Sequence, residues 1–127
     1  MTLTEQIAMW YQAGEHQHTI QAILELPASK RTDELLGELA VACNNMGQYS
    51  MAVLVLEEIR PRAGYTWPWQ YRMGYALYYS AMKAAPQKRA AILSRARDAF
   101  LNALKLDPPE HIKNDCLEFL EWIREDL

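Results

Sequence analysis

Apolar residues recur three and four positions apart along most of the chain, and few segments show the strict alternation of a β-strand. Glycine and proline are scarce and stand where this spacing is interrupted, as expected for residues that end helices. The pattern therefore predicts an all-α fold of about seven antiparallel helices with short connections. Within one domain, residues 1–127, the predicted helix pairs cover 2–27, 32–61 and 67–106, and a closing helix covers 109–125.

Several predicted helix ends carry residues that satisfy free backbone groups. Thr2 and Glu5 have the spacing of a capping box, in which each side chain accepts a hydrogen bond from the other residue's backbone N–H. Thr32 stands in the N-cap position of the third predicted helix. Pro61 is expected to break the fourth helix, and Asp107 is expected to cap the last one.

Small and large residues recur at corresponding positions of the helix pairs, which indicates an internal repeat. The third pair carries this pattern most completely, at Gly74, Ala96, Phe100, Ala103 and Pro108. The middle pair carries it at Ala40, Gly47, Tyr49 and Ala52. In these positions the chain resembles the tetratricopeptide-repeat (TPR) superfamily, whose unit is a helical hairpin of about 34 residues.

The resemblance implies antiparallel helical hairpins stacked as a short TPR-like right-handed solenoid, with a groove lined by the first helix of each pair. Two departures accompany it. Gly74 and Ala96 are 22 residues apart, where the family pattern implies about 12, so the third pair is expected to be longer than usual. In the first pair, Thr19 and Ile23 stand where alanine and an aromatic residue are typical.

An aromatic cluster lies at the start of the fifth predicted helix. Its members fall within fifteen residues and are Tyr65, Trp67, Trp69, Tyr71, Tyr75, Tyr78 and Tyr79. The last four tyrosines share one stripe of a helix, whereas Met73, Gly74 and Leu77 mark a neighbouring stripe that faces the core. The tyrosine stripe is interpreted in two ways: as anchors for a partner in the groove, or as rings packed on neighbouring helices with their hydroxyls at the rim.

The TPR resemblance assigns a set of residues to the groove. They are Tyr11, Gln12, Glu34, Glu38, Val41, Asn44, Asn45, Tyr71, Arg72, Tyr75, Tyr78 and Tyr79. Arg72 could pair with an acidic group of a ligand or lie in a solvated ion pair. Asn44 and Asn45 could hydrogen-bond a peptide backbone or be ordinary polar residues near a helix end.

Co-chaperone members of the TPR superfamily hold a C-terminal carboxylate with Lys, Arg and Asn side chains at set groove positions. In this chain the matching positions hold Glu38, Val41 and Tyr75. The resemblance therefore does not extend to that specificity.

Composition narrows the function classes. The chain has 127 residues, half of them hydrophobic, and a formal net charge of −3, which argues against nucleic acid as the main partner. The first residues lack the basic and apolar regions of a signal peptide, and no stretch has the length of a membrane span, so a cytoplasmic location is expected. Cys43 and Cys116 are expected to be reduced core thiols, with a disulfide as the alternative.

No catalytic motif appears in the sequence. There is no phosphate-binding glycine loop, no dinucleotide turn and no nucleophile elbow. His16 and His18 are two residues apart and point in different directions on a helix, so no metal site is expected. The sequence therefore predicts a module without a cofactor that binds a partner protein or peptide, and not an enzyme.

Three other functions stay open at this stage. The chain could be a dedicated chaperone or an immunity-type neutralising partner of one protein. It could be a homodimer that associates through the tyrosine and tryptophan patch. An enzyme would require a deep pocket with perturbed titratable groups, which a sequence does not show.

Overall fold

The computed structural model describes residues 1–127 and is all-helical, with seven α-helices, one short 3-10 turn and no strand. The helices are α1 (Leu3–Ala13), α2 (His16–Leu24), α3 (Asp33–Asn45), α4 (Tyr49–Ala63), α5 (Trp67–Lys83), α6 (Pro86–Lys105) and α7 (Glu110–Asp126), with the 3-10 turn η1 at Ala28–Lys30. The predicted helical class and the predicted helix order are confirmed.

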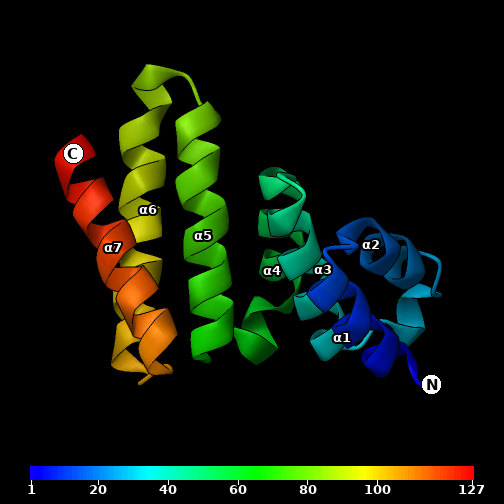
Figure 1. Ribbon diagram of the computed structural model, residues 1–127. Helices are drawn as coiled ribbons and strands as arrows, with labels where there is room; N and C mark the ends of the chain where they lie inside the picture. The colour runs from blue at the N-terminus through cyan, green and yellow to red at the C-terminus, as the bar shows by residue number, and fades with distance from the viewer.

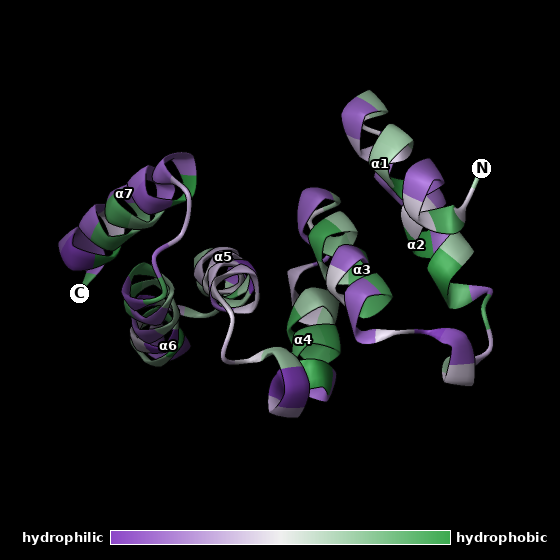
Figure 2. Ribbon diagram, turned by 90° about the horizontal axis from the view of Figure 1, so that it is seen from below, coloured by the Kyte–Doolittle hydropathy of each residue, from purple (hydrophilic) through white to green (hydrophobic).

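The helices form two rows. Each helix packs against the next one in the chain, and α1 also contacts α3, α3 contacts α5, and α5 contacts α7. Seen along the helices, α1, α3, α5 and α7 lie along one side of the molecule and α2, α4 and α6 along the other (Figure 2). α1 and α7, the outer helices of the first of these rows, lie nearer than α5 to the viewer of Figure 1, as the turned view in Figure 2 also shows.

The start of three helices depends on threonine side chains. In α1 the Thr2 hydroxyl accepts from the Glu5 N–H at 3.1 Å and the Glu5 carboxylate accepts from the Thr2 N–H at 3.0 Å, which confirms the capping box. Thr32 caps α3 as predicted. Thr66 caps α5 in the same way, with its hydroxyl oxygen 3.5 Å from the Trp69 amide nitrogen.

Two predicted helix ends are wrong. Pro61 does not break α4, which continues to Ala63; one backbone hydrogen bond is lost in the last turn, and the Gly64 N–H still closes the helix on the Arg60 carbonyl at 2.9 Å. Asp107 does not cap α7. It has a φ of 54°, in the left-handed region that ends α6, and α7 begins only after Pro109.

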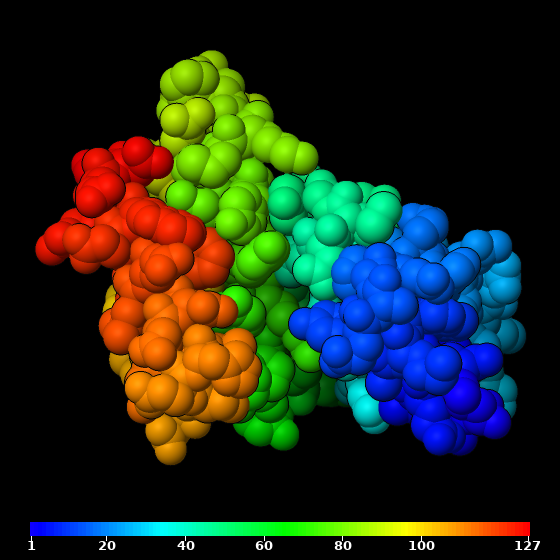
Figure 3. Space-filling model, viewed as in Figure 1, coloured from blue at the N-terminus to red at the C-terminus, as the bar shows by residue number.

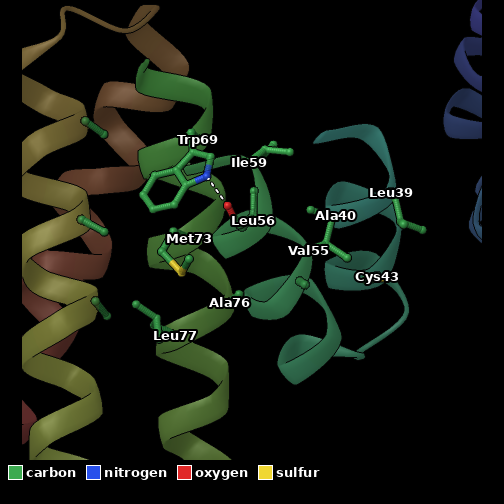
Figure 4. Close-up of a cluster of buried hydrophobic side chains, with 14 of the residues drawn as sticks. Leu39, Ala40, Cys43, Val55, Leu56, Ile59, Trp69, Met73, Ala76 and Leu77 are labelled. Carbon is green, nitrogen blue, oxygen red and sulfur yellow. Dashed lines mark hydrogen bonds between the residues drawn. The ribbon is translucent and has the colours of Figure 1, made fainter. Parts of the chain in front are cut away.

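The centre of the core lies between α3, α4 and α5 (Figure 4). Met73 and Leu77 of α5 are 2% and 4% exposed, so this stripe faces the core as predicted. The buried Trp69 indole N–H donates to the Leu56 carbonyl of α4 at 2.8 Å. This bond satisfies the only polar atom of the largest side chain in the region and fixes α5 against α4.

Gly74 brings α5 and α6 together. A Cβ atom at this position would lie 2.9 Å from two ring atoms of Phe100, which is fully buried. The Phe100 ring in turn stacks on Phe119 of α7, with centroids 4.6 Å apart. Three helices therefore meet at one aromatic pair, and the absence of a side chain at Gly74 makes room for it.

Both cysteines are buried and neither forms a disulfide. Burial raises the pKa of the Cys43 thiol to about 11, and burial together with the nearby Asp115 charge raises that of Cys116 to about 11. The expectation of two core thiols is confirmed.

Candidate functional site

A hollow of about 460 Å³ lies where α1, α3, α5 and α7 face one another. Each of these four helices contributes side chains to its wall, and we call it the four-helix hollow. In Figure 3 atoms of α5 are seen recessed between the N-terminal helices and α7. The volume falls within the range of about 300–1,000 Å³ typical of ligand-binding pockets.

Many of the groove residues assigned from the sequence line this hollow. They are Tyr11, Gln12, Glu34, Glu38, Val41, Tyr71 and Arg72. The other lining residues were not predicted and are Thr4, Ile7, Ala8, Leu35, Trp67 and Ile112. The wall is therefore mostly apolar and aromatic, with one arginine and two glutamates as its charged groups.

Arg72 lies between α3 and α5 and is already partly engaged. Its Nη2 is 3.8 Å from the Glu38 Oε1. Its Nη1 lies only 2.7 Å from the position that a Cβ atom on Gly37 would have. Burial lowers the pKa of the Arg72 guanidinium, and the Glu38 carboxylate opposes that change. The guanidinium thus supports the contact between two helices and leaves the Glu38 side chain, 36% exposed, only loosely paired.

Asn44 does not line the four-helix hollow. It is 6% exposed, and its side-chain amide donates to the Arg72 carbonyl at 3.3 Å, which joins α3 to α5. Its Oδ1 is buried and accepts no hydrogen bond from the protein. The neighbouring Asn45 is exposed and does not line the four-helix hollow. Asn44 thus differs from both interpretations given for this pair, because it is a buried residue that joins two helices.

The tyrosines of α5 form a row that continues away from the four-helix hollow. The Tyr71 and Tyr75 rings are 6.3 Å apart, the Tyr75 and Tyr79 rings are 4.9 Å apart, and Tyr49 of α4 stacks on Tyr79 at 5.2 Å. Tyr75 also packs edge-on against Phe119 of α7 at 5.7 Å. The rings are half-buried, so they pack on α4 and α7 and keep part of their area at the surface.

Burial raises the pKa of these phenols further above the usual value of about 10. The Tyr71 hydroxyl donates to the Asp115 carboxylate of α7 at 3.1 Å, and burial together with the Asp115 charge raises the pKa of Tyr71. Burial also raises the pKa of Tyr75, with smaller contributions from Tyr79 and Tyr49. At neutral pH the row is therefore an uncharged aromatic surface.

A second hollow, of about 380 Å³, lies at the far end of the tyrosine row. We call it the Tyr78–Trp122 hollow; its lining residues are Tyr78, Tyr79, Met82, Trp122, Glu125 and Asp126. The Tyr78 and Trp122 rings are 5.9 Å apart, and Trp122 is 38% exposed. The sequence assigned Tyr78 and Tyr79 to a site but missed the contribution of α7.

A larger hollow, of about 690 Å³, lies at the step where α5 and α6 extend beyond α4. It is lined by Gly47, Gln48, Tyr49, Ser50, Met51, Ser80, Lys83, Ala84, Ala85, Lys88 and Ile92. Lys83 reaches back across this step: its Nζ donates to the Gly47 carbonyl at 3.4 Å and lies 4.9 Å from the centre of the Tyr49 ring. Lys83 therefore already has partners within the chain.

No group of three His, Cys, Asp or Glu side chains lies close enough to hold a metal ion. No helix is both long enough and apolar enough to cross a membrane. The chain matches no family model, no curated protein and no solved structure.

Proposed function

We propose that this chain is a small TPR-like solenoid that binds a partner protein or peptide in the four-helix hollow. The observation that carries the proposal is the alternation of helices around it. The hollow is lined by α1, α3, α5 and α7, whereas α2, α4 and α6 do not contribute to it. The first helices of successive hairpins line the groove in TPR-type solenoids, so this alternation agrees with the repeat pattern in the sequence.

The lining of the hollow suits non-covalent recognition. Tyr11 is 52% exposed, and Trp67 and Tyr71 are half-buried, so all three present apolar area without a large loss of side-chain freedom on binding. Glu34 and Glu38 add carboxylates at one wall. In this mechanism the aromatic residues are the anchors and the carboxylates set the register of the bound segment.

Site-directed photo-crosslinking in the native cell tests the proposal. A photoreactive phenylalanine replaces Tyr11 in one variant and Leu54 in a control variant. Leu54 is 68% exposed on α4 and lies outside the four-helix hollow. We expect one protein to be captured from Tyr11 and not from Leu54, because only the first position faces the bound segment.

Other outcomes identify different functions. If the product from Tyr11 is a second copy of this chain, the hollow is a homodimer contact and the proposal is wrong. Equal capture from both positions would indicate nonspecific contact and would also contradict it. As a second check, Val41→Arg places a charge on the wall of the hollow and should abolish capture while leaving the helical circular dichroism unchanged.

A further inference from the structure

The Tyr78–Trp122 hollow is acidic as well as aromatic. Its lining includes the carboxylates Glu125 and Asp126 and no lysine or arginine. The negative field is felt at the rings: burial raises the pKa of Tyr78 and the Asp126 charge adds to this rise. Tyr79 responds in the same way, with burial as the main cause and Glu118 as an acidic contributor. An anion placed here would be repelled, whereas a cation would be attracted.

Three aromatic rings line the hollow, those of Tyr78, Tyr79 and Trp122. Tyr78 stands edge-on to Tyr79 at 5.1 Å, and α7 contributes the Trp122 ring, 5.9 Å from that of Tyr78. Aromatic faces attract ammonium and guanidinium groups within about 6 Å of the ring centre, and tryptophan is the strongest of them. The chain already contains this interaction twice, because Lys83 lies 4.9 Å from the Tyr49 ring and Arg60 lies 4.9 Å from the Trp69 ring.

The tyrosine row connects this hollow to the four-helix hollow. Tyr71 lines the four-helix hollow and Tyr79 lines the Tyr78–Trp122 hollow, with Tyr75 between them. Eight residues of α-helix separate Tyr71 from Tyr79, which is about 12 Å along the axis. An extended peptide covers that distance with about four residues. A segment anchored in one hollow can therefore place a side chain in the other.

We propose that the Tyr78–Trp122 hollow receives a lysine or arginine side chain of the partner protein, about four residues along the segment from the part that occupies the four-helix hollow. This inference rests on the proposed function and adds the chemistry of the partner. The ring faces of Tyr78 and Trp122 contact the cation, and the carboxylates of Glu125 and Asp126 balance its charge. The partner segment is basic, which complements Glu34, the glutamate of the four-helix hollow that is not paired with Arg72.

Nuclear magnetic resonance of the full ¹⁵N-labelled chain tests the inference with a defined probe. N-acetyl-lysine methylamide is titrated, and the same compound acetylated at Nε serves as the neutral match. We expect the cationic probe to shift the Trp122 indole N–H and the amides of Tyr78 and Tyr79, and the neutral probe to leave them in place. Added salt should weaken the binding, because the carboxylates are exposed.

Two double variants with equal net charge distinguish an effect of these two carboxylates from an effect of the total charge of the protein. Glu125→Gln/Asp126→Asn removes the carboxylates of the hollow, and we expect the affinity for the cationic probe to fall about three- to tenfold. Glu58→Gln/Asp98→Asn removes two exposed carboxylates from α4 and α6 and should leave the affinity unchanged. Equal losses in both variants would show that only the net charge matters and would overturn the inference.

Further results would also overturn it. These are equal shifts with the neutral probe, shifts at other residues only, or no shift at tens of millimolar probe. If crosslinking from Tyr11 still captures a partner in any of those cases, only the cation site is wrong and the proposed function stands. If the probe binds as expected but Tyr11 captures no partner, the proposed function fails, and with it the assignment of the cation to a partner protein.

Discussion

Replacing Gly74 by alanine should destabilise the protein although alanine favours helices. In a helix interior alanine is about 1 kcal/mol more favourable than glycine. The new Cβ would lie 2.9–3.0 Å from three ring atoms of Phe100, whereas carbon atoms in contact are ordinarily about 3.5–4.0 Å apart. Phe100 is fully buried and stacked on Phe119, so its ring has no free space into which to move. Overpacking of this kind costs about 1–3 kcal/mol. Set against the gain of about 1 kcal/mol from helix propensity, it leaves an expected net loss of up to about 2 kcal/mol.

Gly37 offers a matched control within the same fold. It is also a buried helical glycine, but the nearest atom to its added Cβ is the Arg72 Nη1 at 2.7 Å, the end of a flexible and partly exposed side chain. Gly37→Ala should therefore move that guanidinium and leave stability unchanged or raise it by up to about 1 kcal/mol. Urea denaturation followed by circular dichroism measures both variants. A Gly74→Ala protein as stable as Gly37→Ala would refute the reasoning.

Three further changes have defined outcomes. Trp69→Phe removes the hydrogen bond to the Leu56 carbonyl and leaves a space, so the free energy of unfolding should fall by about 1–3 kcal/mol in urea denaturation; an unchanged value would mean that the bond does not matter. Because burial raises the pKa of Cys43 and Cys116 to about 11, neither thiol should react with Ellman's reagent at pH 8 until the chain is unfolded. The pKa of Tyr71 is raised in the folded state, so its neutral phenol favours folding at pH values below the unfolded pKa of about 10, and this contribution is lost as the pH rises further. The free energy of unfolding should therefore fall above pH ~10, and it should fall less steeply in Tyr71→Phe.

Helix order and most helix ends could be predicted because their causes are local. The capping box of Thr2 and Glu5 and the cap at Thr32 depend only on residues a turn apart. The end of α4 was misjudged because one proline in a last turn removes a single hydrogen bond, and the bonds after Pro61 and the burial of Ile59 outweigh that loss.

The start of α7 shows how neighbouring signals compete. A residue before proline is disfavoured in the helical region, so Pro109 disfavours a helical Pro108. Pro109 is itself extended at the N-cap, with ψ of 156°, and α7 begins at Glu110. Asp107 is then free to end α6 in the left-handed region, which aspartate tolerates better than most residues. Its carboxylate lies 3.8 Å from the Lys113 Nζ instead of capping the helix.

The candidate site could be predicted only in part, because it depends on how the helices are turned toward one another. The resemblance placed residues of the first, third and fifth helices on one face, and many of them line the four-helix hollow. The contribution of α7 was missed, although Asp115, Trp122 and Asp126 have the spacing of one helical face. The burial of Asn44 follows from the close approach of α3 to α5, which local spacing does not encode.

The unequal lengths of the helical pairs have a consequence for local opening. α5 and α6 have 17 and 20 residues, whereas α3 and α4 have 13 and 15, and the longer pair projects beyond its neighbours (Figure 1). The projecting turns of α5 and α6 pack against fewer helices than the rest of the pair. We therefore expect their backbone amide hydrogens to exchange with solvent earlier than those nearer the core. Trp67 and Tyr71 line the four-helix hollow from the opposite end of α5. The tip and the four-helix hollow are therefore separated along a single helix, and we expect a change in the length of the tip to leave the hollow unchanged.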